Sequence, residues 1–166
     1  MKLRVFLSFF VASLTLMLAY YFIPDLNAIP DYYAKNVRGS LFTGFLTVGS
    51  FLLSLKTFIV IKLKENIYDS DSYKSNLSNL KKINPSLTLY GPLKRLSFLI
   101  FFSISSAILA SISQLTIGLI ERWEATFFCV FVSIFALGML ISTLLLIKST
   151  LDEWLNYLED EHNKKS

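Results

Sequence analysis

The stretch LFTGFLTVGSFLLSLKTFIVIKLK, residues 41–64, decides how this chain must fold. From residue 41 to residue 61 it holds a single charge, Lys56, and it ends in the basic residues Lys62 and Lys64. An α-helix needs about 20 predominantly apolar residues to cross the hydrocarbon core of a bilayer. The stretch therefore predicts a membrane-crossing helix. A charge inside hydrocarbon is costly, so the direction in which Lys56 points becomes the central question about function.

The composition of the whole chain supports the same conclusion. Of its 166 residues, 54% are hydrophobic and 17% are charged, and the charged residues sit between long apolar runs. A soluble domain mixes both kinds along each element, so this pattern favours a multi-pass membrane protein. The net charge of +4 does not indicate nucleic-acid binding, because the basic residues border apolar runs and membrane topology explains them. Cys129 is the only cysteine, so no intrachain disulfide can form.

Four runs are long enough to cross a membrane: residues 5–23, 41–61, 96–120 and 126–147. Lysine and arginine favour the cytoplasmic side, and they gather before the first run, between residues 62 and 95, and at Lys148. We therefore expect an all-α membrane protein with four transmembrane helices, cytoplasmic N- and C-termini and amphipathic cytoplasmic segments. The expected domains are a four-helix transmembrane bundle over residues 1–150, with a cytoplasmic loop at 62–95, and an amphipathic acidic tail over 151–166.

The ends and loops of these runs fit the layout. The first run ends in Tyr20-Tyr21-Phe22 without a small-residue cleavage site, so we interpret it as a retained span rather than a signal peptide. Pro24 and Pro30 break the first outer loop. Tyrosines at this level are typical of an interfacial aromatic belt: Tyr20, Tyr21, Tyr32 and Tyr33. In the 62–95 loop, helical spacing predicts a short amphipathic helix with Tyr73, Leu77, Leu80 and Ile83 on one face.

Each span carries small and weakly polar residues on one helical face. Membrane helices associate through such residues, because lipid offers no hydrophobic drive between helices. We expect seven of these residues to pack between helices: Thr43, Thr47, Ser50, Ser54, Ser103, Ala107 and Gln114. The alternative is that they line a pore in an oligomer. Lys56 lies roughly opposite the stripe of the second span, so it is expected to face lipid or a groove. We expect Lys56, Lys62 and Lys64 to contact lipid headgroups. The alternative is that Lys56 is a gating or ion-pathway charge, which would require the stripe to face away from the bundle.

The C-terminal tail, LDEWLNYLEDEHNKKS, predicts an amphipathic helix that continues from the fourth span. Its apolar side holds Leu151, Trp154, Leu155 and Leu158, and acidic residues cover the rest. Two interpretations stay open: a docking surface for a cytoplasmic protein or neighbouring subunit, and a helix that lies on the bilayer.

The sequence contains no catalytic motif, phosphate-binding glycine loop or set of metal-ligating residues. An intramembrane enzyme would need paired ionisable residues within its spans, and none are present. We therefore expect no enzymatic activity, no catalytic residue, no cofactor and no metal.

The layout resembles the small four-helix inner-membrane proteins of bacterial phage-defence loci, such as the RexB-like proteins of phage exclusion and the KwaA-like proteins of Kiwa. The resemblance is one of architecture over nearly the whole chain. Its features are four spans, a proline-bearing first outer loop, the segment GFLTVGSFLLSLKTF followed by IKLKENIYDSDSYKSNL, a tiny second outer turn and an acidic tail. It implies an oligomeric sensor or ion-conducting effector in the bacterial inner (cytoplasmic) membrane, which works with a cytoplasmic partner.

Two functions from different classes remain open. The first is a non-enzymatic component of an antiviral defence system that senses membrane disturbance, or depolarises the membrane as an ion channel. The second is an immunity protein against a pore-forming bacteriocin, which would bind the toxin through its lipid-facing surfaces. In both, membrane lipid is a partner and direct nucleic-acid binding is not expected.

Overall fold

A computed structural model describes residues 2–86 and 88–165, with side chains described except at 2, 71, 72, 76, 83, 154, 157, 158 and 160–165. The long elements are six α-helices: α1 (Lys2–Phe22), α2 (Ile29–Asn36), α3 (Arg38–Leu63), α4 (Asp71–Ile83), α5 (Gly91–Leu115) and α6 (Trp123–Lys165). Short helical turns lie at Leu26–Ala28, Lys64–Tyr68 and Ile117–Leu119. The described part of the chain is thus entirely helical in its regular structure.

Four helical segments are long and apolar enough to cross a membrane: Leu3–Phe22, Arg38–Tyr68, Gly91–Leu119 and Trp123–Glu153. They match the four predicted runs, and the prediction of an all-helical, multi-pass membrane protein is confirmed to that extent. Several helix ends differ from the predicted ones: α3 extends past both ends of its run, whereas α5 ends at Leu115 rather than at residue 120. α5 starts at Gly91 rather than near residue 96, because Pro92 is well suited to the first turn of a helix. α6 runs without a break from the fourth span into the tail, which agrees with the predicted continuation of the fourth span as a helix.

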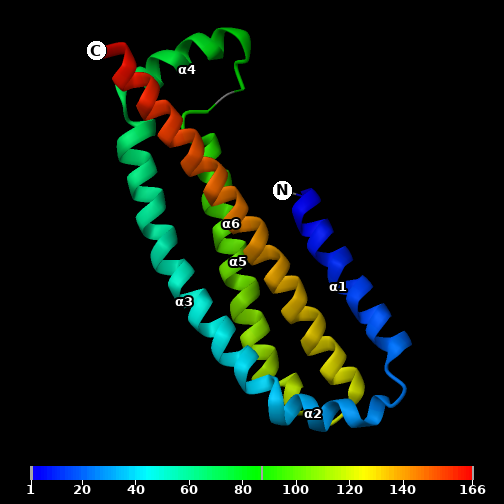
Figure 1. Cartoon of the computed structure of the whole chain (residues 1–166). Helices are drawn as coiled ribbons and strands as arrows, with labels where there is room; N and C mark the ends of the chain where they lie inside the picture. Colours follow the sequence, from blue (N-terminus) through cyan, green and yellow to red (C-terminus); the bar gives the residue numbers. More distant parts are fainter. Residues whose placement is uncertain (1, 87, 166) are drawn as a thin grey trace.

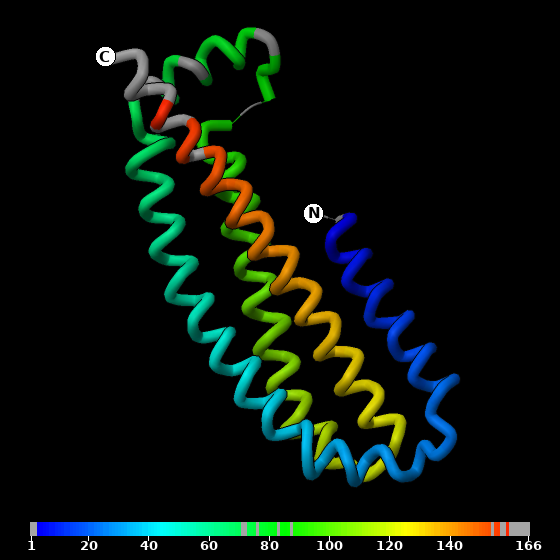
Figure 2. Tube along the Cα trace, viewed as in Figure 1, coloured from blue at the N-terminus to red at the C-terminus, as the bar shows by residue number. Residues whose placement is uncertain are grey.

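The crossing helices pack as an open row in the order α3, α5, α6 and α1, rather than as a closed four-helix bundle (Figure 1). α5 lies between α3 and α6, and α1 packs on the far side of α6. α5 has the largest buried fraction of the four, and α1 has the smallest. Figure 2 shows that α1 starts part-way along α6, which extends well beyond it. We call the end of the molecule with α4 and the end of α6 the C-terminal end, and the opposite end the α2 end.

Two different kinds of contact hold the row together. Between α3 and α5 the contact is apolar and large, with Phe45, Leu52 and Ile59 of α3 in one core cluster with Ile100 and Ile104 of α5. Between α1 and α6 the contact is close and uses small residues. Ser8 and Ala12 of α1 are buried, and Gly138 of α6 lies directly against Ser8. Small residues let helix backbones approach closely, which is a usual mode of packing in membranes.

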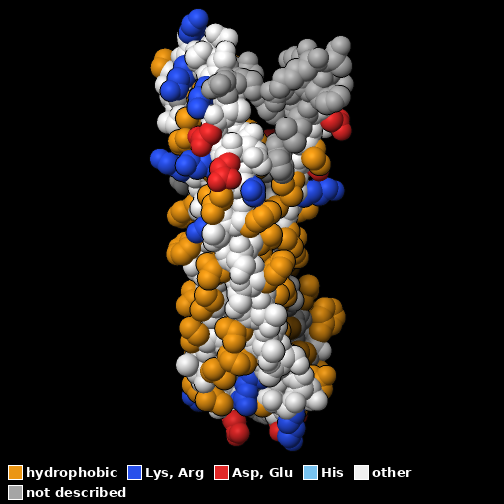
Figure 3. Space-filling model, turned by 90° about the vertical axis from the view of Figure 1, so that its left-hand side faces the viewer, with side chains coloured by type: hydrophobic (Ala, Val, Ile, Leu, Met, Phe, Trp, Pro, Cys, Tyr) orange, Lys and Arg blue, Asp and Glu red, His pale blue; other side chains and the backbone are white. Residues whose placement is uncertain are grey.

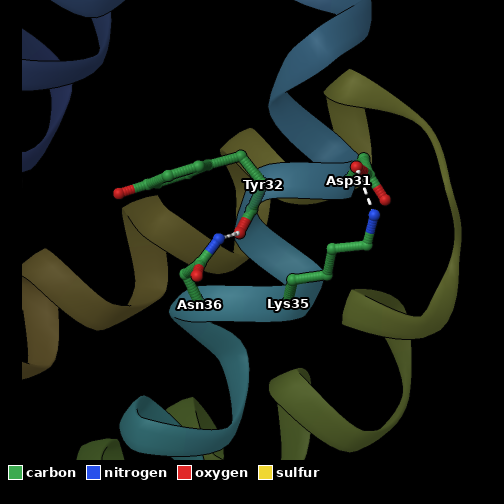
Figure 4. Close-up of polar contacts among 4 residues, drawn as sticks. All are labelled: Asp31, Tyr32, Lys35 and Asn36. Atoms are coloured by element: carbon green, nitrogen blue, oxygen red, sulfur yellow. Dashed lines mark hydrogen bonds and ion pairs between the residues drawn. The ribbon is translucent and has the colours of Figure 1, made fainter.

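The first outer loop is more ordered than the sequence suggests, because it contains α2. This helix lies across the α2 end of the row and contacts both α3 and α6. Pro30 fits its first turn, and Lys35 Nζ forms an ion pair with Asp31 Oδ2 at 2.8 Å on the exposed side (Figure 4). Asn36 Nδ2 also donates to the carbonyl of Tyr32, at 3.0 Å.

The tyrosines expected to form an aromatic belt separate into two groups. Tyr20, Tyr21 and Tyr32 are exposed, as an interfacial belt requires. Tyr33 is buried under α2, so its assignment to the belt is wrong. The amphipathic helix expected in the 62–95 loop is α4, which Ser70 caps by accepting a hydrogen bond from the backbone N–H of Tyr73 at 3.3 Å.

Candidate functional site

Lys56 lies on the side of α3 that packs toward α5. Its side chain is half-buried, and its Nζ atom lies 5.0 Å from the centre of the Phe101 ring on α5. A lysine in this position over an aromatic ring is stabilised by about 0.5–1 kcal/mol at an exposed site, and by more when it is desolvated. Lys56 is therefore turned toward a neighbouring helix, whereas the sequence pattern placed it opposite the packing face.

The weakly polar stripe of α3 faces away from the other helices of this chain. Its members are exposed: Thr43, Thr47, Ser50 and Ser54. The opposite face, with Phe45, Leu52 and Ile59, is the buried one. The expectation that this stripe packs within the chain is wrong for α3, and the orientation is the one that the gating interpretation of Lys56 required.

The reason lies in how serine and threonine satisfy their hydroxyl groups. Ser50 Oγ donates to the carbonyl of Leu46 at 2.9 Å, and Thr57 Oγ1 donates to the carbonyl of Leu53 at 3.3 Å. Because each hydroxyl bonds the backbone one turn earlier, it needs no partner helix and tolerates an apolar environment. The large apolar side chains on the other face then gain more contact by packing against α5.

The polar residues expected to pack in the third span lie between α5 and α6. Ser103 Oγ donates to the carbonyl of Met139 at 3.0 Å and lies 2.5 Å from Thr143 Oγ1. Ala107 is fully buried. These hydroxyl contacts link two crossing helices in an environment where an unpaired polar group would be costly.

Gln114 is fully buried at the α2 end and joins three elements. Its Oε1 accepts a hydrogen bond from the Tyr33 hydroxyl of α2, and its Nε2 donates to Ser133 Oγ of α6 at 3.0 Å. Ser133 Oγ donates in turn to the carbonyl of Cys129 at 2.8 Å. Burial raises the pKa of Tyr33 to about 12, so its hydroxyl remains a proton donor over the physiological range. Gln114 thus fixes α2 onto the row. Its contact with Tyr33 could not be found from spacing, because the two residues are far apart in the chain.

The three lysines expected at lipid headgroups do not lie together. Lys62 Nζ lies 3.8 Å from Glu65 Oε2, and Lys64 Nζ lies 3.9 Å from Asp69 Oδ2. Both lysines are exposed. Exposed ion pairs of this kind contribute little stability. The lysine that shares a surface with Lys56 is Lys94, at the start of α5, which the sequence pattern did not single out.

A groove of about 400 Å³ lies between α3 and α5 near the C-terminal end. It is lined by Lys56, Val60, Leu93, Lys94, Ser97, Phe98 and Phe101. Its walls are mostly apolar, and the charged groups among its described lining residues are the two lysines. Figure 3 shows the surrounding surface, with hydrophobic side chains along the length of the molecule and charged side chains gathered near the two ends.

Arg4 lies at about the same level along the molecule as Lys56. Arg4 Nη1 donates to the carbonyl of Ser142 on α6 at 3.0 Å. The Ser103 contacts place this part of α6 level with the Phe101 region of α5, and Lys56 lies beside Phe101. From Trp123 to Ser142, α6 rises about 28 Å at about 1.5 Å per residue. This length matches the roughly 30 Å of a hydrocarbon core. Lys56 and Arg4 thus form one basic layer.

A second basic layer lies further toward the C-terminal end. Lys62 follows Lys56 by six residues of helix, which is about 9 Å at about 1.5 Å per residue. Lys94, Arg95 and Lys148 occupy the corresponding ends of the apolar runs in α5 and α6. Apolar side chains between the two layers remain exposed, among them Phe58, Phe98 and Leu145. The groove therefore extends from the first basic layer toward the second.

The docking residues expected in the tail are only partly described. Leu151 is half-buried against the core cluster, and Leu155 is exposed. The side chains of Trp154 and Leu158 lie outside the described residues. Leu151 thus supports the end of α6 on its own chain rather than offering a free surface.

Among the residues that the structure describes, no group of three or more His, Cys, Asp or Glu side chains could hold a metal ion. Comparison of the chain with protein-family models, with curated proteins and with solved structures finds no match.

Proposed function

We propose that this protein is a non-enzymatic component of an anti-phage defence system in the bacterial inner membrane, where it senses membrane disturbance or depolarises the membrane with a cytoplasmic partner. In this proposal the C-terminal end, with both termini and loop 62–95, faces the cytoplasm. The second basic layer supports this orientation, because lysine and arginine favour that side.

The observation that carries the proposal is the position of Lys56. Lys56 is half-buried as a residue and lines a groove between α3 and α5, with its Nζ atom beside the Phe101 ring. A charge at the edge of the hydrocarbon core that is turned toward a neighbouring helix is a functional candidate. The free energy of such a charge depends on how closely phosphate and water approach it. A change in lipid packing would therefore alter the stability of the α3–α5 contact, which couples the membrane to the conformation of the protein.

The open row bears on whether the protein conducts ions by itself. Helices in a row enclose no central pore within one chain, so depolarisation would need several copies. The exposed hydroxyl face of α3, with Thr43, Thr47, Ser50 and Ser54, is the surface that such an oligomer would place around a water-filled path. The exposed part of α6 near Leu155 would face the cytoplasmic partner.

A phage challenge tests the proposal directly. Bacteria that express the chain together with its neighbouring genes should survive infection better than cells without it. A potential-sensitive dye should report depolarisation during infection. Lys56→Gln should abolish both effects, and Lys62→Gln, which changes a solvent-exposed lysine of the same helix, should preserve them. Equal protection by both variants would remove the role assigned to Lys56, and no protection by the unmodified chain would refute the defence function.

The second candidate, an immunity protein against a pore-forming bacteriocin, is favoured by one specific feature. α1 packs almost solely on α6 and leaves most of its apolar surface exposed, including Phe6, Phe10 and Met17. Such a surface suits the binding of a toxin helix within the membrane. Survival of a bacteriocin, rather than of a phage, would select this function.

A further inference from the structure

The groove between α3 and α5 has the shape and polarity of a site for an amphiphile. Phe98, Phe101 and Val60 give it apolar walls, and Ser97 adds one hydroxyl group. It lies at the C-terminal end of the hydrocarbon-sized part of the molecule. A molecule with an apolar chain and a polar head could therefore enter it sideways from the membrane, without crossing a barrier.

The charge of the groove selects the kind of head group. Lys56 and Lys94 both line it, and none of its described lining residues is acidic. The other large cleft near this end differs in this respect, because it is lined by Arg95 together with Glu153. Lys62 and Lys64 lie near carboxylates of their own segment and do not line the groove. The groove is thus a place near the membrane surface where, among the described side chains, two lysines line one space and no carboxylate does.

The depth of Lys56 adds a requirement for an anion. Its ammonium group lies beside the Phe101 ring, and its backbone position on α3 lies about 9 Å deeper than that of Lys62, at about 1.5 Å of helix rise per residue. A desolvated ammonium is costly unless an anion or water reaches it. A phosphate drawn into the groove would supply that anion, and its acyl chain would continue along Phe98 and Phe101 toward the middle of the membrane.

We propose that this groove binds one anionic phospholipid, with the phosphate between Lys56 and Lys94 and an acyl chain along Phe98 and Phe101. The inference rests only on the membrane location of the four helices, so a failure of the proposed defence function would leave it unaffected. Phosphatidylglycerol is the probe that matches the required charge, and phosphatidylethanolamine, which has no net charge, is the comparison.

The test measures lipid retained by the full chain. The protein is purified from nanodiscs that contain equal amounts of phosphatidylglycerol and phosphatidylethanolamine, and native mass spectrometry then counts the bound lipids. We expect one phosphatidylglycerol to be retained in preference. A lysine near a membrane surface changes anionic lipid binding by about fivefold. Lys56→Gln and Lys94→Gln should each reduce retention by about that factor, and the double variant by more.

Lys62→Gln is the matched control, because it removes a lysine from the same helix but outside the groove. Because Lys62 is exposed near the membrane surface but does not line the groove, this variant should reduce retention by clearly less than Lys56→Gln or Lys94→Gln does. Circular dichroism and size-exclusion chromatography establish that each variant folds. Lys94 lies at the exposed rim, so Lys94→Gln keeps the test valid even where Lys56→Gln weakens the fold. Equal retention of the two lipids would overturn the proposal. So would an equal loss in Lys62→Gln, or cross-linking that shows a second copy of the chain covering the groove.

Discussion

The contact between Gly138 and Ser8 provides a sharp test of how α1 is held. A Cβ atom added at Gly138 would lie 2.8 Å from Ser8 Oγ, 2.9 Å from Ser8 Cβ and 3.3 Å from Ser8 Cα. Favourable contacts between carbon atoms lie at about 3.5–4.0 Å. The Ser8 hydroxyl could rotate away, but its Cβ and backbone atoms cannot move without the helix. Gly138→Ala therefore has to push α1 away from α6.

The size of the effect follows from two opposing contributions. Alanine is favoured over glycine in a helix by up to about 1 kcal/mol. Overpacking of a tight contact costs about 1–3 kcal/mol. We expect Gly138→Ala to lower the free energy of unfolding by about 1 kcal/mol, because α1 has little other packing to offset the loss. Gly49→Ala is the matched control. Its added Cβ would meet Ile108 and Ala107 at 3.7 and 3.8 Å, which is ordinary contact, so it should be neutral or stabilise by up to about 1 kcal/mol.

The assay is unfolding of the detergent-solubilised protein by increasing fractions of sodium dodecyl sulfate, followed by circular dichroism. Trp123 fluorescence in a Trp154→Phe background adds a local report, because the Trp123 ring lies 6.2 Å from the Tyr20 ring of α1. Ser8→Gly should restore much of the stability lost in Gly138→Ala, since it removes the two closest contacts. Neighbouring residues typically show coupling of about 0.5–3 kcal/mol in such cycles. Equal effects of the two glycine variants, or no coupling with Ser8→Gly, would refute the close packing of α1 on α6.

Three further predictions concern the other polar and small residues of the spans. Gln114→Leu should destabilise the protein by about 1–3 kcal/mol, because it leaves buried polar partners unpaired. In the same unfolding assay, the double variant with Tyr33→Phe should lose less stability than the sum of the two single losses. Strict additivity of the two losses would contradict the hydrogen bond between Tyr33 and Gln114. Because the pKa of Tyr33 is raised by burial to about 12, the stability that its neutral hydroxyl contributes should be complete below about pH 10 and be lost as the pH rises toward about 12. The free energy of unfolding should therefore fall more steeply over this pH range for the unmodified chain than for Tyr33→Phe. An equal fall in the two proteins would exclude this role of Tyr33. Ser50→Leu should change monomer stability by less than about 0.5 kcal/mol, as usual for an exposed position. Ala107→Leu, at a fully buried position, should cost about 1–3 kcal/mol. A larger loss of stability in Ser50→Leu than in Ala107→Leu would show that the outward face of α3 is misassigned.

Lys56 illustrates why the direction of a side chain could not be obtained from periodicity. The sequence correctly separates Lys56 and the hydroxyl stripe onto opposite faces of α3, because that separation depends only on helical geometry. It does not say which face packs. In water the polar face would be the outer one, but in lipid both faces are tolerated, since serine and threonine can bond their own backbone.

The helix α2 shows a second limit. Two prolines and two tyrosines in the first outer loop, with two more tyrosines at the end of the first run, indicated a broken interfacial segment. The structure instead turns Tyr33 inward, because Gln114 offers it a buried hydrogen-bond acceptor. The partner lies on α5, so no local pattern in the loop could reveal the contact.

The amino-acid pattern alone was enough to predict four helices that are long and apolar enough to cross a membrane. That property depends on the length of each apolar run and on the need of every backbone polar group for a hydrogen bond within its own segment. Three further features had to be read from the packed helices: the order of the helices in the row, the face that α3 presents to α5 and the lysine that shares a groove with Lys56. These features depend on the shapes of side chains from distant segments, because packing rather than hydrophobicity arranges helices that are already in lipid.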